Sequence, residues 1–568
     1  MKSWRTILIL VFIVAFGAGI VTRLFYIQIL QHKLYESQAL GQQLGFDKIT
    51  GARGQIFCDN SQQSKGKESA GQVKSLAINK DEWIVSAEPS KITDKNLFAK
   101  TLSKNIGQTE EEIVSKISGQ DAYIVLAKEV SFEQLEKIKT LGLEGLSWQA
   151  DSKRFYPQGS LAPQIIGFLG GEKTGQYGIE GYFEDVLKGK SGIQEQKKGL
   201  TSIFSSETEL SLEGSDIYLT IDYNIQFQAE SLLKKAKQNM DIDSGQIIVM
   251  KPDTGKILAL ANFPLFDPNN YGKETNFDVF QNSAVQKLFE PGSIMKPFTM
   301  AMALNEGKIT PDTKYVDKGF LKIGVETIHN FNNKVYGERI MTEVLENSIN
   351  TGAVFAEEQV SHKTFLEYLE KFGFLDKTGI DLQGEVRSRN ELLKNGQDIE
   401  FATASFGQGI ELTPLQVVTG YCALANGGKI VKPYIVEKIV NGGDEIKKNV
   451  KVSDKIFSDQ THSQLTKMLI NVLENGYDKI GKIPGYYLAG KTGTAQVPLE
   501  NGKGYYENKT IQSFVGFAPA ENPEFVIMVK LDNPKVSSSS LSAVPLFKEL
   551  AQFMINYWQI PPNYDIKP

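Results

Sequence analysis

One ten-residue segment, 290–299, constrains the fold more than any other stretch, and its sequence is Glu-Pro-Gly-Ser-Ile-Met-Lys-Pro-Phe-Thr. A Pro-Gly break precedes Ser293 and an apolar run follows Lys296, which is typical of a turn that opens into a buried helix. Residues three apart share one helix face, so we expect the Lys296 ammonium group beside the Ser293 hydroxyl. A serine nucleophile needs such a neighbouring base, and burial can make a lysine basic enough. The pair indicates covalent acyl transfer.

The Ser-x-x-Lys spacing is weak evidence by itself, because it recurs in the chain. It is found at residues 64 and 67 in a polar loop, and at residues 231 and 234 on a predicted helix. A second segment, Ser348-Ile349-Asn350, follows a predicted helix over 341–346. The Ser348 hydroxyl could relay a proton from Ser293, and the Asn350 amide could hold both a substrate amide and the lysine.

A third segment, Lys491-Thr492-Gly493-Thr494, follows a predicted strand over 486–490. One lysine and two hydroxyls on a strand can bind a terminal carboxylate, and a glycine lets a substrate backbone lie close. An edge-strand N–H can point at a developing oxyanion. Lys-Thr-Gly also occurs at 173–175 and 377–379, where we expect turns, and Ser-Arg-Asn at 388–390 copies the second motif in a charged loop.

Composition excludes several classes of protein. A chain of 568 residues predicts two or three domains, and its net charge of -5 provides no basic surface for nucleic acid. The two cysteines and four histidines are scattered without ligand spacing, so we expect no metal and no cofactor. Cys58 and Cys422 are predicted to be unpaired thiols.

The N-terminus predicts a membrane anchor over 6–30. Residues 6–22 carry no charge, and this length is near the lower limit of roughly 17 residues for a spanning helix. Arg23 could snorkel and extend the span. Lys2 and Arg5 precede it, which places the N-terminus in the cytoplasm and the rest outside. A cleaved signal peptide is the alternative, but no small-residue cleavage site follows the apolar run.

Periodicity along the chain predicts two further units. In the first, over 31–210, we expect helices at 31–44, 95–106 and 132–141, an exposed loop at 62–73, a turn that leads into a strand within 51–59, and a strand that ends in glycines at 165–171. In the second, we expect strands at 217–221, 246–250, 256–261, 512–517 and 525–531, helices at 224–237 and 543–557, and a mostly helical stretch over 280–425. A sheet built from both ends of this unit with helices between them is an α/β domain.

In this order, Ser293-x-x-Lys296, Ser348-x-Asn350 and Lys491-Thr492-Gly493-Thr494 resemble the motifs of the penicillin-binding proteins and serine β-lactamases. Nearly the whole chain resembles class B penicillin-binding proteins, most closely the division-type FtsI family. The segments behind this likeness are Arg-Gly-Gln-Ile at 53–56, Arg-Phe-Tyr-Pro at 154–157, Gly-Ile-Glu at 178–180, Leu-Thr-Ile-Asp at 219–222, Thr-Gly-Ile-Asp at 378–381, Ser-Phe-Gly-Gln-Gly at 405–409, Thr-Pro-Leu-Gln at 413–416 and Ser-Phe-Val-Gly-Phe-Ala-Pro at 513–519. Among the few departures, serines at 537–540 stand where the resemblance predicts glycines.

The resemblance implies a domain plan. It gives a short cytoplasmic tail at 1–5, a transmembrane helix at 6–30, a mixed α+β pedestal of the dimerisation type at 31–210 and a transpeptidase domain at 211–568. The last would have the α/β fold of penicillin-binding transpeptidases and serine β-lactamases, with a central antiparallel sheet and helices. The expected location is the plasma membrane, with a single pass and an extracytoplasmic catalytic domain.

The resemblance also implies an activity, a peptidoglycan D,D-transpeptidase that forms cross-links at the division septum. Ser293 would attack the D-Ala-D-Ala donor stem peptide, and an acceptor amine of a neighbouring stem would take the acyl group. Lys296 would be the acylation base with Ser348 in the proton path, while Lys491, Thr492 and Thr494 would hold the carboxylate. The N–H groups of Ser293 and Thr494 would form the oxyanion hole. β-Lactam antibiotics should trap Ser293, and the expected partners are a membrane glycan polymerase and divisome proteins.

The motifs also fit other functions. A β-lactamase or β-lactam sensor shares two of them, but a class A β-lactamase needs a Glu-x-x-Leu-Asn loop, which the segment 391–395 does not provide. An elongation-type transpeptidase would carry the same three motifs as a division-type enzyme. A non-catalytic scaffold of the division machinery is the remaining hypothesis, and the complete set of motifs argues against it.

Overall fold

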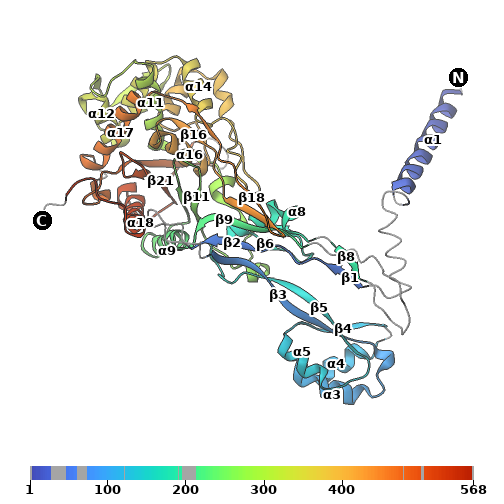
Figure 1. Cartoon of the computed structure of the whole chain (residues 1–568). Coiled ribbons are helices and arrows are strands. Elements are labelled where there is room, and N and C mark those ends of the chain that lie inside the picture. Colours follow the sequence, from blue (N-terminus) through green and yellow to red (C-terminus); the bar gives the residue numbers. More distant parts are fainter. Residues whose placement is uncertain are drawn as a thin grey trace. The chain divides into compact units, whose positions relative to one another are not determined.

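The computed structural model describes residues 3–26, 28, 47–60, 73–119, 122–189, 191–194, 213–476, 479–499 and 504–565 (Figure 1). The chain divides into two units, Met1–Gly54 with Asp185–Ser215, and Gln55–Glu184 with Asp216–Pro568. The predicted helix over 31–44 and most of the predicted loop over 62–73 lie outside the described residues.

The first unit contains a helix and a two-stranded sheet. Helix α1 spans Ser3–Phe25, and strand β1 (Asp47–Thr50) pairs antiparallel with β8 (Ser191–Gln194). In the described part of the chain, no helix combines the length and the apolar character that crossing a bilayer requires. The predicted span over 6–30 is therefore not confirmed, and its last residues lie outside the described ones.

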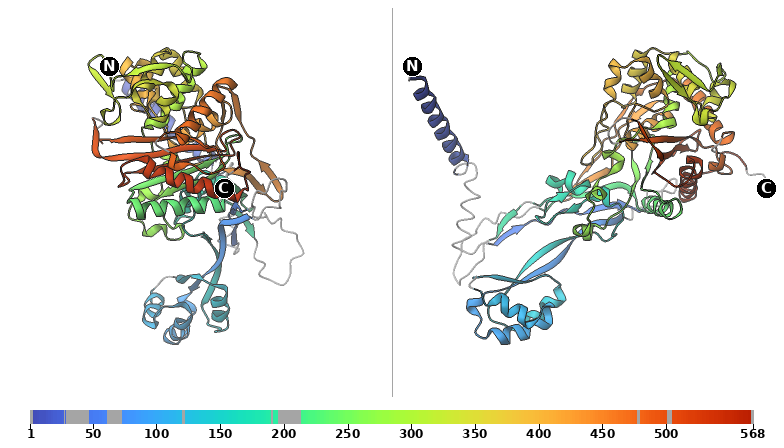
Figure 2. Two further views of the ribbon diagram at one scale, coloured as in Figure 1. Left: turned by 90° about the vertical axis from the view of Figure 1, so that its left-hand side faces the viewer. Right: turned by 180° about the vertical axis from the view of Figure 1, so that it is seen from behind.

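The second unit begins with a long antiparallel arm. Strand β3 (Val73–Ala87) pairs with β2 (Ile56–Asp59), β4 (Ile124–Val130) and β5 (Leu146–Phe155). Three helices pack at one end of it, namely α3 (Lys95–Ile106), α4 (Glu110–Ile117) and α5 (Phe132–Lys139) (Figure 2). Asp94, Thr109 and Ser131 cap these helices through their side-chain oxygens, which explains where each helix begins.

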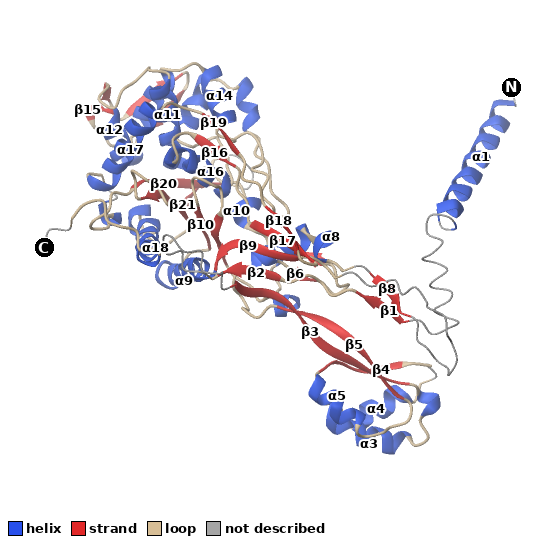
Figure 3. Ribbon diagram, viewed as in Figure 1, coloured by secondary structure: helices blue, strands red, loops and turns tan. Residues whose placement is uncertain are grey.

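A five-stranded antiparallel sheet forms the centre of the second unit, in the order β11-β10-β22-β21-β20 (Figure 3). The strands are β10 (Ser244–Met250), β11 (Ile257–Phe263), β20 (Ala489–Pro498), β21 (Tyr505–Ala518) and β22 (Phe525–Asp532). Strands from both ends of this part of the sequence thus lie side by side, as the sequence predicts.

Helices cover both faces of this sheet. Helices α9 (Tyr223–Met240) and α18 (Ala543–Tyr557) share one hydrophobic core with β10, β21 and β22. Helix α16 (Pro414–Ala425) packs on β10, β21 and β22, and all its residues are buried. A helix that is buried on every side is a core helix, and α16 therefore belongs to the packed interior of this unit.

The second unit contains further helices and strands. The helices are α6 (Pro163–Ile166), α7 (Gly178–Tyr182), α10 (Ser283–Gln286), α11 (Lys296–Asn305), α12 (Met341–Glu346), α13 (Asn350–Glu358), α14 (His362–Lys371), α15 (Asp398–Ser405) and α17 (Asp459–Glu474); α8 (Glu184–Leu187) crosses the boundary. The strands are β6 (Phe168–Leu169), β7 (Gly175–Gln176), β9 (Asp216–Asp222), β12 (Lys314–Asp317), β13 (Phe320–Ile323), β14 (Glu326–His329), β15 (Gly337–Ile340), β16 (Lys429–Val431), β17 (Val436–Asn441), β18 (Asp444–Lys447) and β19 (Val452–Lys455).

Two predicted strands are wrong in part. Of the predicted strand over 165–171, the first two residues belong to α6 and only residues 168 and 169 form β6. The helix forms because proline is accepted in the first turn of a helix, and it ends at Gly167, which has φ of 78°. Strand β20 begins at Ala489 and not at residue 486, so the Lys-Thr-Gly-Thr segment lies within the strand. Cys58 and Cys422 are buried free thiols, as predicted.

Candidate active site

Ser293 and Lys296 lie on consecutive turns at the start of a buried helix. Ser293 belongs to the 3-10 turn η5 (Gly292–Met295), and Lys296 is the first residue of α11. In a 3-10 turn, side chains three residues apart are eclipsed, so the two residues point to the same side. Ser293 is half-buried, whereas Lys296 is completely buried.

The Lys296 amine is held by three oxygen atoms of the second motif. Its Nζ lies 2.5 Å from the Ser348 carbonyl oxygen, 2.8 Å from Asn350 Oδ1 and 3.2 Å from Ser348 Oγ. The two carbonyl oxygens can only accept, but the hydroxyl can also donate. A neutral amine therefore fits this cage well, with its two N–H groups on the carbonyls and its lone pair toward the Ser348 hydroxyl.

The environment of Lys296 favours this neutral form. Burial disfavours the ammonium ion and, with the positive charge of Lys491, holds the pKa of Lys296 well below its ordinary value. A lysine with a lowered pKa can accept a proton at moderate pH. The structure thus provides a candidate general base three residues from a candidate nucleophile.

The backbone around Ser348 is strained in a way that aims the second motif at the lysine. Ser348 has φ of 54°, in the left-handed region that serine rarely adopts. This conformation follows the end of α12 and turns the Ser348 carbonyl toward Lys296. Asn350 begins α13, and its Nδ2 donates to the His329 carbonyl at 3.0 Å, which fixes Oδ1 on the lysine. Such strain is commonly found at functional sites.

A buried polar network holds Thr351, the residue directly after Asn350. The Asp317 carboxylate accepts hydrogen bonds from Thr351 Oγ1 at 2.7 Å, from Asn330 Nδ2 at 3.0 Å and from the Tyr336 N–H at 2.7 Å. Burial raises the pKa of Asp317, but these hydrogen bonds outweigh it and hold the pKa below its usual value. Sequence analysis missed Asp317, because its role depends on partners that are distant in the chain.

Strand β20 lies directly against the turn that carries Ser293. A Cβ atom added to Gly493 would lie 2.9 Å from the Pro291 carbonyl oxygen, and one added to Gly292 would lie 3.2 Å from the Thr494 carbonyl oxygen. Both contacts are tighter than ordinary, so glycine is required for this approach. The backbone of the Lys-Thr-Gly-Thr segment therefore lies in contact with the turn that carries Ser293.

The side chains of the third motif alternate between the interior and the surface. Lys491 and Gly493 are buried, Thr492 is half-buried and Thr494 is exposed. The Lys491 Nζ donates to the Thr492 carbonyl and hydroxyl oxygens, both at 3.3 Å. A cation and two hydroxyls along one strand can receive an anionic group that enters beside Ser293.

Three groups to which sequence analysis assigned no role support the turn η5. Gly407, with φ of 86°, accepts from the Gly292 N–H at 3.0 Å, and a Cβ atom there would lie 2.2 Å from the Gly292 carbonyl oxygen. Tyr421 of α16 donates its hydroxyl to the Ile294 carbonyl at 2.9 Å. Glu290 accepts from the Gly409 N–H at 2.9 Å. The glycines of the 405–409 segment were a usable signal for this close packing.

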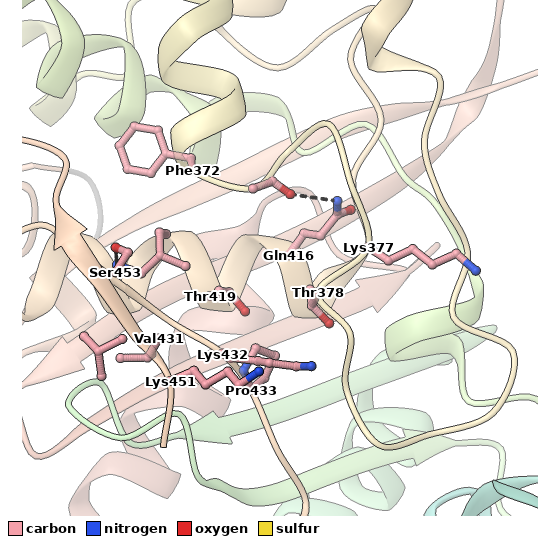
Figure 4. A pocket seen from close by; sticks show the side chains of 13 residues that line it. Phe372, Lys377, Thr378, Gln416, Thr419, Val431, Lys432, Pro433, Lys451 and Ser453 are labelled. Atoms are coloured by element: carbon pink, nitrogen blue, oxygen red, sulfur yellow. Dashed lines mark hydrogen bonds between the residues drawn. The ribbon is translucent and has the colours of Figure 1, made fainter. Parts of the chain in front are cut away.

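Three of the other copies of the motifs, those at 231–234, 377–379 and 388–390, make structural hydrogen bonds, and the copy at 64–67 lies outside the described residues. Ser388 Oγ and Asn390 Nδ2 both donate to the Phe374 carbonyl, and the Thr378 hydroxyl donates to Glu385. Ser231 Oγ bonds its own helix at Phe227. A cavity of about 340 Å³ near Thr378 is lined by residues such as Gln416 and Lys432, and none of the predicted site residues lines it (Figure 4).

The support of η5 by Gly407 can be tested by Gly407→Ala. The added methyl group would clash with the Gly292 backbone and force a left-handed alanine, so we expect a loss of stability of about 3 kcal/mol. Gly442→Ala is the matched control, because Gly442 also has a positive φ of 56° but has no atom within 4 Å of the added methyl. It should cost only about 1 kcal/mol. Urea unfolding measures both, and equal losses would contradict the close packing.

Comparison with known proteins identifies the family of the chain. The model for the penicillin binding protein transpeptidase domain matches residues 245–552, and that for the penicillin-binding protein dimerisation domain matches residues 48–219. Stage V sporulation protein D of Bacillus subtilis is 33% identical, with 81% of this chain and 73% of that protein covered. Peptidoglycan D,D-transpeptidase FtsI of Buchnera aphidicola is 31% identical, with 86% of each chain covered.

Solved structures show the same fold. Penicillin binding protein 3 of Mycobacterium tuberculosis, complexed with ampicillin, superposes with a TM-score of 0.71 at 26% identity, covering 92% of this chain and 98% of that one. Penicillin binding protein 2X of Streptococcus thermophilus has a TM-score of 0.76 at 21% identity, covering 91% of this chain and 81% of that one. The predicted fold class and family are confirmed: this chain belongs to the penicillin-binding transpeptidases of class B, with a dimerisation domain before the transpeptidase domain.

Proposed function

We propose that this protein is a peptidoglycan D,D-transpeptidase that cross-links stem peptides through an acyl-enzyme on Ser293. The observation that supports it best is the convergence of three distant segments, with Lys296 held by Ser348 and Asn350 while β20 packs against the Ser293 turn. The names of the relatives agree with this activity, since several are peptidoglycan D,D-transpeptidases.

In the proposed acylation, Lys296 takes the proton of the Ser293 hydroxyl as Ser293 Oγ attacks the carbonyl of the D-Ala-D-Ala bond. The new bond joins Oγ to that carbonyl carbon, and the C–N bond to the terminal D-Ala breaks. The leaving amine needs a proton, and Ser348 Oγ, at 3.2 Å from Lys296 Nζ, provides the path for it. An acceptor amine then attacks the ester and restores Ser293.

Strand β20 would bind the anionic end of the donor. Lys491 supplies positive charge, and Thr492 and Thr494 present oxygen atoms along the same edge. Gly493 allows the close contact with the Ser293 turn. The N–H groups of Ser293 and Thr494 would donate to the developing oxyanion. In a serine protease, one such donor lowers the activation free energy by about 3–4 kcal/mol. β-Lactams carry a carboxylate near a strained amide, so they should acylate the same serine.

We propose the division septum as the place of action, together with a membrane glycan polymerase and divisome proteins as partners. The relative named FtsI supports a division-type enzyme, whereas the one named as a sporulation protein makes wall synthesis during sporulation the second candidate. The proposed membrane anchor at 6–30 rests on the uncharged N-terminal run and on Lys2 and Arg5. The proposed pedestal at 31–210 and transpeptidase domain at 211–568 are supported by the family matches over 48–219 and 245–552.

Mass spectrometry after penicillin treatment tests the nucleophile. We expect one adduct, on the peptide that contains Ser293, and none in Ser293→Ala. The adduct should persist, because a transpeptidase releases penicillin slowly. Ser231→Ala, at a surface copy of the motif, should leave the adduct unchanged. An adduct on another residue would contradict the assignment of Ser293, and rapid turnover of nitrocefin would instead favour a β-lactamase.

The pH dependence of acylation tests the state of Lys296. Because burial and then the Lys491 charge lower the Lys296 pKa, the neutral base is present at lower pH than for an exposed lysine. The acylation rate should therefore rise with pH, with a midpoint below the ordinary lysine pKa. Lys491→Met removes a positive charge, so the Lys296 pKa should rise and the midpoint should move to higher pH.

Second-order rate constants with a fluorescent penicillin, measured from about pH 5 to about pH 10, give this midpoint. The control is Lys535→Met at an exposed lysine, which should leave the midpoint unchanged. A midpoint that stays in place in Lys491→Met would contradict the coupling between the two lysines.

A further inference from the structure

A buried serine lies behind the third motif, in the segment where the family resemblance predicts glycines. Ser539 begins the 3-10 turn η9 (Ser539–Leu541) and is only 2% exposed. Its Oγ donates to the Gly493 carbonyl oxygen at 2.5 Å and lies 2.9 Å from Thr494 Oγ1. Ser539 therefore contacts both of the residues of β20 that approach the Ser293 turn.

The direction of the second hydrogen bond follows from counting protons. A hydroxyl has one proton, and the Ser539 proton is directed to the Gly493 carbonyl, which can only accept. In the contact between the two hydroxyls, Thr494 must therefore be the donor. Thr494 is an exposed residue, but its hydroxyl proton is directed to Ser539 Oγ. A carboxylate also only accepts, so Thr494 cannot donate to it without giving up Ser539.

The position of Ser539 is fixed by a second set of hydrogen bonds. Ser542 is completely buried and donates to Gln512 Oε1 at 2.5 Å, and Gln512 Nε2 donates to the Val536 carbonyl at 2.7 Å. Gln512 is the direct cross-strand partner of Thr494 in the pairing of β20 with β21. The 536–542 segment is thus clamped to the sheet at the level of Thr494, which leaves Ser539 little freedom to turn away.

We propose that Ser539 is a positioning residue that determines how this enzyme recognises the anionic end of its substrate. It holds the Thr494 proton, so that Thr494 must give up its hydrogen bond to Ser539 before it can donate to the carboxylate, and recognition of the carboxylate depends more on Lys491 and Thr492. This inference rests on the proposed function, because it concerns the carboxylate that β20 is proposed to bind.

The test compares benzylpenicillin with its methyl ester, which lacks the negative charge. The second-order acylation rate constant is measured for each compound, and the ratio of acid to ester is the readout. Ser539→Ala and Ser539→Gly free the Thr494 proton for the carboxylate, so the ratio should rise about threefold to tenfold, the worth of one hydrogen bond. A change in strand rigidity alone affects both compounds and cancels in the ratio. Glycine is the residue type that the resemblance predicts here, so this variant should fold.

Two controls define the outcome. Ser537→Ala, at an exposed serine of the same run, should leave the ratio unchanged. In a Thr494→Val background, Ser539→Ala should have no effect on the ratio, because the proton in question is gone. If Ser293 is still acylated but the ratio of acid to ester stays constant or falls in both Ser539 variants, the inference is overturned. If neither compound acylates Ser293 in the unmodified protein, the proposed function fails and this inference fails with it.

Discussion

The burial of one amino group is the constraint on which the active site depends. Transfer of a lysine ammonium group out of water is costly, and the protein lowers this cost by favouring the neutral amine. Lys296 is completely buried, yet all three contacts of its Nζ are oxygen atoms, two of which accept only. The same burial that disfavours the ammonium ion makes Lys296 a candidate base for Ser293. The positive charge of Lys491 acts in the same direction.

The rest of the fold keeps this arrangement in place. The fully buried helix α16 supports the Ser293 turn through Tyr421, and Gly407 allows the turn to lie against the 405–409 segment. From the other side, the sheet presents β20 at its edge, where glycines at 292 and 493 permit backbone contact. Ser539 then reaches the same strand from behind. Each segment is far from the others in the sequence, so only the packed core of sheet and helices can hold them together.

Much of this could be predicted from the sequence, because the features are local. Periodicity gave the helix at 543–557 with its bounds, and the Pro-Gly break before Ser293 marked the turn. The start of β20 was missed, since residues 486–488 have the composition of a strand but do not pair in the sheet. Asp317 and Ser539 were missed as well, because a buried carboxylate or hydroxyl is recognised only by its partners. Both bond residues that are more than thirty positions away along the chain.

The titration of Lys296 itself is the most direct test of its role as the base. Lysine labelled with ¹³C at Cε reports protonation of Nζ by NMR, and the Lys296 signal is assigned by its loss in Lys296→Met. We expect this signal to titrate well below the 10.5 of an ordinary lysine. A signal that titrates at or above that value would show a permanently charged group, and Lys296 could not then act as the base for Ser293.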